Sequence, residues 1–370
     1  MYLQKLSLVN FKNYSQLDIA FHPKMNCFVG NNGMGKTNLL DAIHYLSFCK
    51  SFFNAIDSQN IRYEQGFFMI QGDFLLNGAP EEIYCAVKRN QKKQFKRNLK
   101  EYDRLSEHIG LFPLVMISPS DIELIVGGSE ARRKFIDSII TQFDKDYLDK
   151  LISFQHVLSQ RNALLKRFAE SRSFDSLALE IWDEQLIIYG NSLHQKRKKF
   201  IAEFTPLFEK NYRFISESKE SVSLVYESSL HERDYKTLLL TNLERDRVMQ
   251  YTTAGIHRDD LDFVLQDQSL KKFASQGQQK SYLLALKLAQ FEMIKSIKHN
   301  PPMLLLDDIY DKLDENRFRK LIELVSSDSY GQVFITDTHA QRIEELFKDA
   351  QTGYSIFYVD NAEVKTNSHA

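Results

Sequence analysis

The chain has 370 residues, 43% of them hydrophobic and 26% charged, which supplies a sizeable buried core and leaves room for two or three domains. Its formal net charge is -1, so the whole protein is no polycation, and any contact with nucleic acid must come from a local basic patch. No apolar stretch approaches the roughly 20 residues of a membrane-spanning helix, and residues 1–14 lack a signal-peptide core. We therefore expect a cytoplasmic protein with no membrane partner.

The N-terminal part predicts three strands that lead into a glycine-rich loop. Alternating apolar residues indicate strands over residues 2–9 and 17–21, with a polar break at 10–14 between them. An apolar run over 25–29 indicates a third strand, and the run 38–48 is competent to form a helix. A phosphate loop lies between a strand and a helix, so this predicted order supports the interpretation of the glycine-rich loop as one.

The loop itself fits the pattern G-x-x-x-x-G-K-[ST]. Its glycines let backbone N–H groups turn inward around the β- and γ-phosphates of ATP, helped by the positive end of the following helix. Lys36 would bridge the phosphate oxygens as a point charge and so assist catalysis, and Thr37 would offer its hydroxyl to Mg²⁺. A plain glycine turn with a solvated lysine is the alternative. The predicted nucleotide-binding residues are Gly30, Asn31, Asn32, Gly33, Met34, Gly35, Lys36 and Thr37.

Two further strands are predicted over residues 67–76 and 83–87, with Asn77 and Gly78 as a hairpin turn signal between them. The three cysteines, Cys27, Cys49 and Cys85, are odd in number and scattered, a pattern that fits neither a disulfide framework nor a zinc site. We expect them to be core thiols.

A basic run follows over residues 88–100, with seven lysines or arginines and no carboxylate. One interpretation is a hairpin whose faces are simply solvated. The other is a contact with the phosphate backbone of DNA, in which Phe95 sits against a sugar or base. No base-reading motif accompanies the run.

The segment 129–219 is almost free of glycine and proline, and its apolar residues recur at helical spacing. It predicts a helical insertion, and because no heptad persists over several repeats, we expect a compact lobe rather than a long coiled coil. A second basic cluster, residues 196–199, is interpreted as a solvated helix face in preference to a contact with DNA. A return strand over 222–226, a helix over 238–248 and a strand over 261–265 follow, with the polar hexapeptide 255–260 as a turn.

The C-terminal part contains two further candidate site segments: a helix N-terminus suited to binding an anion, and a strand that ends in two aspartates. Ser275 and Gly277, with Gln278, open a helix that runs to about residue 295, and this corner is suited to closing over a γ-phosphate held by another subunit. The apolar strand 303–306 ends in Asp307 and Asp308, at the strand edge where α/β sheets place ligands. Asp307 would hold Mg²⁺, and Asp308 would orient or deprotonate the attacking water; a plain helix cap is the alternative.

The remaining predicted elements are a helix over 316–325, a core strand over 332–336 and an edge strand over 353–360. Residues 336–339 stand at the end of the core strand, where a γ-phosphate sensor belongs. Residues 362–370 are expected to form a loose tail.

Together, the phosphate loop, the S-Q-G-Q-Q corner and the L-L-L-D-D strand resemble ABC-type ATPases of the SMC-like branch. Within that branch the chain is similar to the RecF family of bacterial recombination mediators over nearly its whole length. The segments that carry this similarity are residues 10–14, 119–137, 255–260, 275–280 and 304–308.

The resemblance implies an α/β fold: an ABC/SMC-like P-loop ATPase head with an antiparallel β subdomain and an inserted helical lobe. The expected domains are 1–126 and 246–370 for the head and 127–245 for the lobe. The implied function is ATP-dependent binding of single-stranded and duplex DNA at gaps during repair and replication restart. The implied partners are a second copy of the chain, joined on ATP, then RecR, and indirectly RecO and RecA. A weak DNA-stimulated ATPase would act as the switch.

The chain departs from the family pattern at several positions. Ser120 and Ser129 stand where the family usually has an acid and a proline, and residues 311–314 read D-K-L-D instead of S-E-L-D. No glutamine follows the strand 114–117 at the Q-loop position, and either Asp337 or His339 occupies the sensor position. Two other functions stay open: a nucleotide-gated scaffold of an SMC-like defence system, and an ABC transporter ATPase subunit.

Overall fold

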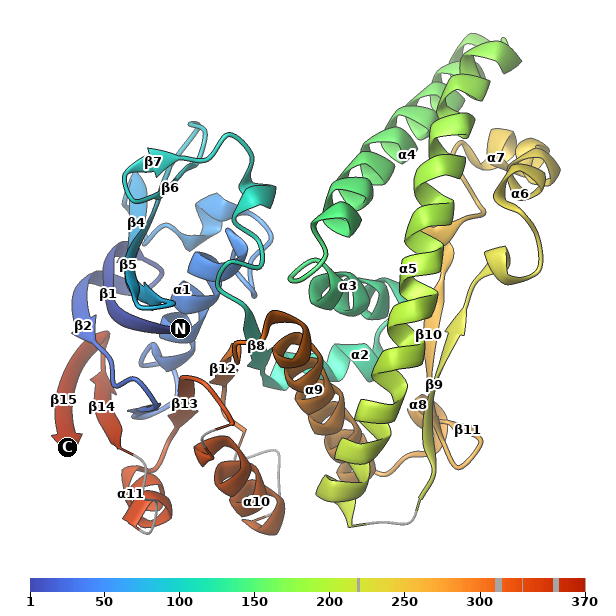
Figure 1. Ribbon diagram of the computed structural model, residues 1–370. Coiled ribbons are helices and arrows are strands. Elements are labelled where there is room, and N and C mark those ends of the chain that lie inside the picture. The colour runs from blue at the N-terminus through green and yellow to red at the C-terminus, as the bar shows by residue number, and fades with distance from the viewer. Residues whose placement is uncertain (218–219, 310–314, 328, 349–352, 370) are drawn as a thin grey trace. The chain divides into compact units, whose positions relative to one another are not determined.

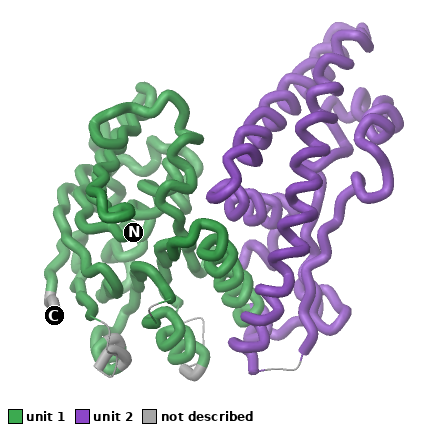
Figure 2. The backbone as a smooth tube through the Cα atoms, in the orientation of Figure 1, with its two compact units in different colours: residues 1–121, 280–370 green, residues 122–279 purple. Residues whose placement is uncertain are grey.

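The computed structural model describes residues 1–217, 220–309, 315–327, 329–348 and 353–369 (Figure 1). The chain forms two compact units (Figure 2). Unit 1 comprises Met1–Asp121 and Lys280–Ala370, and unit 2 comprises Ile122–Gln279. The predicted lobe ended at residue 245, but the structure keeps residues 246–279 in unit 2. The reason is strand pairing, since β10 (Asp260–Leu265) forms an antiparallel ladder with β9 (Val222–Glu227).

The first sheet of unit 1 is the predicted antiparallel β subdomain, with strand order β2-β1-β4-β5-β6-β7. One face buries alternate residues against the core, as the period of two requires. Asn77 and Gly78 both have positive φ, 52° and 82°, and close the β4–β5 hairpin as the sequence predicts. Its strands are β1 (Tyr2–Phe11), β2 (Tyr14–Ala20), β4 (Phe67–Leu76), β5 (Ala79–Lys88), β6 (Gln94–Arg97) and β7 (Lys100–Glu101).

The second sheet of unit 1 has the order β15-β14-β3-β13-β12-β8 and is parallel except for its β14–β15 edge. The prediction of a loose tail is wrong, because β15 pairs along the whole of β14. A parallel strand pair needs long connections, so β3 meets partners from distant parts of the chain. The strands are β3 (Met25–Val29), β8 (Leu114–Ile117), β12 (Met303–Leu306), β13 (Val333–Asp337), β14 (Tyr354–Asp360) and β15 (Glu363–His369).

Helix α1 (Lys36–Phe48) lies between these two sheets and contacts strands of both. This explains why the helix is buried on most sides rather than along one stripe, with Leu39, Leu40, Ile43 and Leu46 each completely buried. The three cysteines are free and buried, as predicted. The other helical segments of unit 1 are η1 (Asp57–Asn60), η2 (Leu105–Glu107), α10 (Glu315–Ser326) and α11 (Ala340–Lys348), with η3 (Pro119–Ile122) at its boundary; α9 (Gln276–Lys298) begins in unit 2 and continues into unit 1.

Unit 2 is built on two long antiparallel helices, α4 (Lys145–Ser171) and α5 (Ser176–Ser216), which pack along each other. Asp144 and Asp175 cap their N-termini by accepting hydrogen bonds from backbone N–H groups. The helix predicted over 238–248 is broken in two at Asn242. The remaining elements are α2 (Glu123–Val126), α3 (Ser129–Ile140), η4 (Ser229–His231), α6 (Tyr235–Thr241), α7 (Leu243–Met249), η5 (Ile256–Arg258), β11 (Gln268–Ser269) and α8 (Leu270–Phe273).

A buried arginine of unit 2 joins two of the segments that carry the family resemblance, 119–137 and 255–260. Arg197, only 2% exposed, forms ion pairs with Asp137 at 2.9 Å and with Asp259 at 3.3 Å. It also donates to the Ile256 carbonyl at 2.9 Å. The interpretation of residues 196–199 as one solvated face is therefore wrong for Arg197, while Lys196 bonds to Asp144. Buried charges are tolerated only when paired in this way.

None of the helices within the described residues combines the length and the apolarity that crossing a bilayer requires.

Candidate nucleotide-binding site

The glycine-rich loop connects β3 to α1, and two of its glycines sit where a side chain cannot. Gly30 has φ 153°, and a Cβ there would lie 2.1 Å from the carbonyl oxygen of Val359. Gly35 has φ 116°, and a Cβ there would lie 2.6 Å from the Asn13 amide and 2.9 Å from the Tyr14 hydroxyl. The loop is thus enclosed by neighbouring backbone on one side and by polar side chains on the other.

The turn between β1 and β2 braces this loop. The sequence predicted this turn only as a break between two strands. Asn13 donates to the Met34 carbonyl at 3.2 Å and accepts from the Asn38 amide at 2.7 Å. Tyr14 donates to the Gly35 carbonyl at 3.1 Å. The segment 10–14 was among those that carried the family resemblance, and the structure explains its residue types by these contacts.

Lys36 points back into the loop. Its buried Nζ donates to the carbonyl oxygens of Gly30 and Asn31, at 2.7 and 3.0 Å. An ammonium carries three N–H donors, so a phosphate oxygen can be bound as a further acceptor. Within the described residues the Lys36 ammonium bonds to backbone carbonyls and to no carboxylate, so it can still bind an anion.

The loop and the acidic strand end meet at one hydrogen bond. Thr37 donates from Oγ1 to Asp307 Oδ1 at 2.9 Å, and Thr336 donates to the same oxygen at 2.9 Å. Burial raises the pKa of Asp307 to about 6, although these hydrogen bonds oppose the shift. A cation beside the carboxylate would favour its ionised form, so the site is poised for a positive ligand.

Asp308 completes the site from the next position. Its φ is 44°, and its backbone N–H donates to Thr336 Oγ1 at 2.9 Å. A pocket of about 190 Å³ is lined by residues that all belong to unit 1: Asn32, Gly33, Gly35, Lys36, Thr37, Asn38 and Asp308. A lysine, a threonine hydroxyl and the Asp308 carboxylate therefore line one cavity, and Asp307 bonds to that threonine.

The oxygen donors at this site fit Mg²⁺. The Thr37 hydroxyl and the Asp307 carboxylate are hard ligands of the kind this ion takes. Within the described residues no group of three or more His, Cys, Asp or Glu side chains could form an all-protein metal cage. Mg²⁺ in proteins is typically held by one or two carboxylates together with substrate phosphates and waters, which is the donor set available here.

The two candidate sensor residues differ sharply in environment. The Asp337 side chain is 2% exposed and accepts from the His339 backbone N–H at 2.8 Å and from Arg342 at 3.3 Å. The His339 side chain is 64% exposed and bonds to the neighbouring Thr338 hydroxyl. Asp337 therefore already accepts hydrogen bonds at the start of α11, whereas the His339 side chain, just before this helix, is exposed. Residues 311–314, which depart from the family pattern, lie outside the described residues.

The predicted signature corner opens α9 in unit 2. The Gln278 N–H donates to Ser275 Oγ at 3.3 Å, and Gln278 Oε1 accepts from the Ser275 N–H at 2.8 Å, which forms a reciprocal capping box. Gln278 also donates to Glu220 at 2.8 Å. Gly277 follows in the first turn of the helix. This arrangement fixes the helix N-terminus and leaves Ser275 exposed.

The basic run 88–100 contains less free charge than its sequence suggests. Lys93 turns inward to Asp57 at 2.8 Å and to the Cys49 carbonyl at 2.6 Å, and Arg97 pairs with Glu81. Phe95 is 1% exposed and packs edge-on against His108, so the predicted contact between Phe95 and a nucleic acid is wrong. It faces the core because it alternates with the surface residues of β6.

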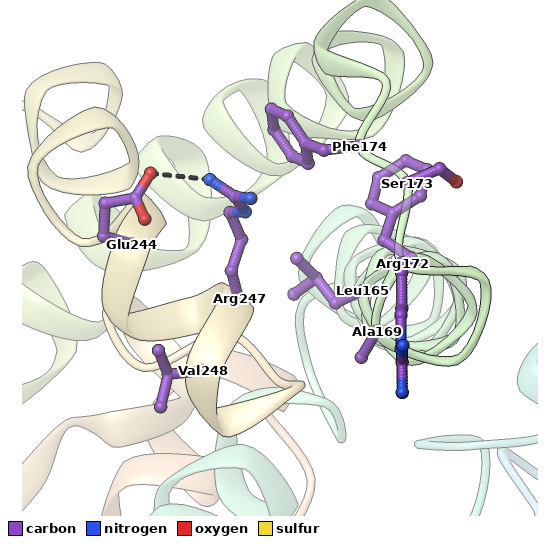
Figure 3. Close-up of a pocket in the computed structure, with 9 residues that line it drawn as sticks. Leu165, Ala169, Arg172, Ser173, Phe174, Glu244, Arg247 and Val248 are labelled. Atoms are coloured by element: carbon purple, nitrogen blue, oxygen red, sulfur yellow. Dashed lines mark hydrogen bonds and ion pairs between the residues drawn. The ribbon is translucent and has the colours of Figure 1, made fainter.

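Unit 2 contains a larger pocket, of about 380 Å³, that no nucleotide motif lines (Figure 3). Arg247 crosses it from α7, pairs with Glu244 at 2.8 Å and lies 4.3 Å from the centre of the Phe174 ring. Its cation is thus already engaged on both sides. We assign the nucleotide site to the smaller pocket, because only that one brings the phosphate loop and the acids together.

Comparison with known proteins matches the chain to the family RecF/RecN/SMC N terminal domain over residues 2–365. The DNA replication and repair protein RecF of Flavobacterium johnsoniae is 52% identical over 357 residues, covering 96% of this chain and 99% of that relative. RecF of Phocaeicola vulgatus is 51% identical over 366 residues, covering 98% of each.

Solved structures agree with the sequence comparison. The recombination mediator protein RecF–ATP of the RecFOR pathway superimposes with a TM-score of 0.90 at 29% identity, covering 99% of this chain and 98% of that one. The Smc head domain bound to ScpA, from Pyrococcus furiosus, has a TM-score of 0.57 at 18% identity, covering 100% of this chain and 96% of that one. The latter likeness concerns the fold alone.

Proposed function

Because this chain belongs to the RecF family of DNA replication and repair proteins, we propose that it is a recombination mediator that binds DNA at gaps under the control of ATP. The observation that carries the proposal is the Thr37–Asp307 hydrogen bond, which joins the phosphate loop to the acidic strand end at a single cavity. A nucleotide bound there would meet Lys36 and Asp308 in the same pocket. Membership of this family argues against the transporter and defence-scaffold alternatives.

Each side chain of the site has a role in this proposal. The loop N–H groups and Lys36 bind the β- and γ-phosphates, and Thr37 and Asp307 hold Mg²⁺. When bound, the ion neutralises charge that develops on the phosphates during hydrolysis. Asp308 orients the attacking water and accepts its proton. A carboxylate one methylene shorter than glutamate reaches less far, which suits slow, DNA-stimulated turnover.

We assign the γ-phosphate sensor to His339 rather than Asp337. The Asp337 carboxylate already accepts from Arg342 and from a backbone N–H, and a second anion beside it would be repelled. The exposed imidazole of His339 can donate to a phosphate oxygen. A His339→Ala variant should hydrolyse ATP more slowly yet still bind it.

The signature corner would act on the partner subunit's nucleotide. Ser275, Gly277 and Gln278 stand at an exposed helix N-terminus, where N–H groups and the helix dipole favour an anion. The phosphate loop of the same chain already supplies its own phosphate contacts. Two copies that exchange these parts would trap two nucleotides between them, which makes dimerisation depend on ATP.

Simple linkage arithmetic supports a switch driven by binding. If each ATP binds the closed dimer about 100-fold more tightly than the separated subunits, saturation contributes about 2.7 kcal/mol per nucleotide. Two nucleotides contribute about 5.4 kcal/mol, close to the roughly 5.5 kcal/mol that converts a 1:99 population into 99:1. Hydrolysis then has only to reopen the dimer, and a slow rate sets its residence time on DNA.

The wider proposal places this switch in the cytoplasm, where the dimer on single-stranded or duplex DNA at a gap would engage RecR and, through it, RecO and RecA. These partners follow from family membership. They predict that a DNA-bound, ATP-closed dimer is the form that partner proteins recognise.

The test is to follow association and DNA binding of the same preparation. Sedimentation velocity at micromolar concentration with ATP and Mg²⁺ should show a dimer that is absent without nucleotide. Fluorescence anisotropy with gapped, single-stranded and duplex DNA should show binding that needs ATP and weakens with salt. The Asp308→Asn variant should prolong the dimer on DNA. A protein that stays monomeric with ATP and ignores all three DNAs at low salt would refute the proposal.

A further inference from the structure

The β4 and β5 strands carry, at one end, a surface that the nucleotide site does not use. We define the aromatic–basic rim as residues 62–67, which end at the first residue of β4, and residues 88–92, which begin at the last residue of β5. The rim contains four cations and one carboxylate, Glu64, so its local charge is strongly positive. The four cations are Arg62, Lys88, Arg89 and Lys92, and none of them forms an ion pair with a carboxylate in the part of the chain that the structure describes.

The rim also exposes two aromatic rings. Tyr63 is 84% exposed, and Phe67 is 43% exposed. Phe67 stands directly opposite Lys88 in the β4–β5 ladder, so ring and cation share the outer face of the sheet. The next pair, Phe68 and Val87, points into the core. The exposed aromatics thus lie among the free cations instead of in the buried layer.

Hydrogen bonds from Arg89 to two backbone carbonyls fix the two halves of the rim beside each other. The Arg89 N–H donates to the Gly66 carbonyl at 3.1 Å, and Arg89 Nε donates to the Gln65 carbonyl at 3.3 Å. The Arg62 N–H donates to the Asn10 carbonyl at 2.8 Å, which ties this half to the β1–β2 turn. A surface held in this way loses little conformational entropy when a ligand binds.

From this arrangement we propose that the aromatic–basic rim is the contact surface for single-stranded DNA, with phosphates on Lys88, Arg89 and Lys92 and unpaired bases stacked on Tyr63 and Phe67. The inference rests on the proposed function and names the surface that serves it. Positive grooves with aromatic platforms are how proteins bind single strands without sequence preference. In a duplex the base faces are hidden in the stack, so the rings would contribute nothing there.

The rest of the basic run supports this choice of residues. Lys93 and Arg97 are paired with Asp57 and Glu81, and Phe95 is buried, so these three residues cannot serve a ligand. The two exposed aromatic rings come from residues 62–67, a segment that carries no run of charge in the sequence.

The test measures binding of full-length protein, with a non-hydrolysable ATP analogue and Mg²⁺, to fluorescein-labelled oligothymidylate and to a duplex of the same length. The triple variant Lys88→Ala/Arg89→Ala/Lys92→Ala should lower the slope of log affinity against log salt by about two on the single strand, because each phosphate contact accounts for roughly 0.7. Tyr63→Ala should weaken single-strand binding about tenfold and leave duplex binding unchanged, whereas Tyr63→Phe should retain it. The double variant Lys198→Ala/Lys199→Ala removes two exposed cations of unit 2 and should change neither.

A Tyr63→Trp variant gives a readout that does not depend on affinity. Stacked bases should quench its added fluorescence when oligothymidylate binds, and Trp182 supplies a constant background in the parent protein. If the parent protein binds DNA but the rim variants bind it equally well, if the new tryptophan is not quenched, or if the Lys198/Lys199 variant loses binding instead, the rim is not the contact surface. A parent protein that binds no DNA with ATP overturns the proposed function itself.

Discussion

Two sets of charged residues, one in each unit, have opposite surroundings. In unit 1, Lys36 donates to two backbone carbonyls and Asp308 lines an open pocket, so both can still bind a ligand. In unit 2, Arg161 is fully buried and pairs with Asp246 at 2.6 Å and Asp183 at 2.5 Å. The comparison teaches that charge serves binding where its partners are weak and serves architecture where charges satisfy each other.

The largest effect is expected in the buried network of unit 2. Replacing Arg161 by Met should lower the free energy of unfolding by about 3–5 kcal/mol, because Asp246 would remain buried without its cation. The matched control is Arg167→Met, an exposed arginine on the same helix, which should change stability by less than about 0.5 kcal/mol. Urea denaturation measures both, and equal losses would mean that the buried pair has no special structural role.

Acid should reveal that unit 1 also depends on a buried polar group. His108 is fully buried, bonded to the Leu46 carbonyl and the Tyr102 hydroxyl, and burial lowers its pKa to about 4. The folded state therefore keeps the imidazole neutral while the unfolded chain takes up a proton near pH 6.5. Its contribution is present above pH 6.5 and is lost as pH falls towards 4, by up to about 3 kcal/mol.

The His108→Gln variant should flatten this pH dependence by close to one proton. Unfolding free energy measured by urea at several pH values between 4 and 7 tests it. Parallel profiles for the variant and the parent protein would show that other groups cause the acid sensitivity.

The comparison is sharpened by a charge whose removal should affect binding and not folding. Lys36→Met should weaken the affinity for a non-hydrolysable ATP analogue about tenfold to a hundredfold, because charge-assisted bonds to phosphate are lost. The unfolding free energy should change far less than in Arg161→Met. Calorimetric titration measures the affinity, and Lys50→Met, at an exposed position after α1, is the control. A large loss of stability with unchanged affinity would reverse the assignment of roles.

The smallest effect concerns the corner at the start of α9. Ser275→Ala removes the capping hydroxyl and should lower stability by about 1 kcal/mol. Ser275→Asp should restore stability, since aspartate caps as well as serine, yet it should oppose ATP-dependent dimerisation because its carboxylate repels phosphate. If Ser275→Asp dimerises normally with ATP, this corner does not contact the nucleotide.

Local patterns with a strict chemical requirement were predictable from the sequence. The phosphate loop, the acid-terminated strand and the Asn77–Gly78 hairpin each depend on neighbouring residues, and the structure forms all of these local elements. The brace by Asn13 and Tyr14 was not predictable in detail, since it joins the β1–β2 turn to a loop whose shape is fixed elsewhere.

The predictions were wrong where a run of charged residues was interpreted as a single unit. Within residues 196–199, Arg197 faces inward while Lys198 and Lys199 face solvent, and only the packing of α5 against its neighbours decides which. Phe95 was misjudged in the same way, because the alternation of β6 buries it between an exposed and a half-buried neighbour. The boundary at 245 failed because β10 returns to pair with β9, a contact between distant segments that no local signal marks.

The phosphate loop is also tied to parts of the chain that the ribosome makes much later. Its strand β3 pairs with β13 and β14, Gly30 packs against the Val359 carbonyl, and the Met34 carbonyl accepts from the Ala362 N–H at 3.1 Å. A nascent chain that has released only its first hundred or so residues therefore carries the whole motif without the framework that shapes it. The final shape of the loop therefore depends on strands that synthesis delivers last.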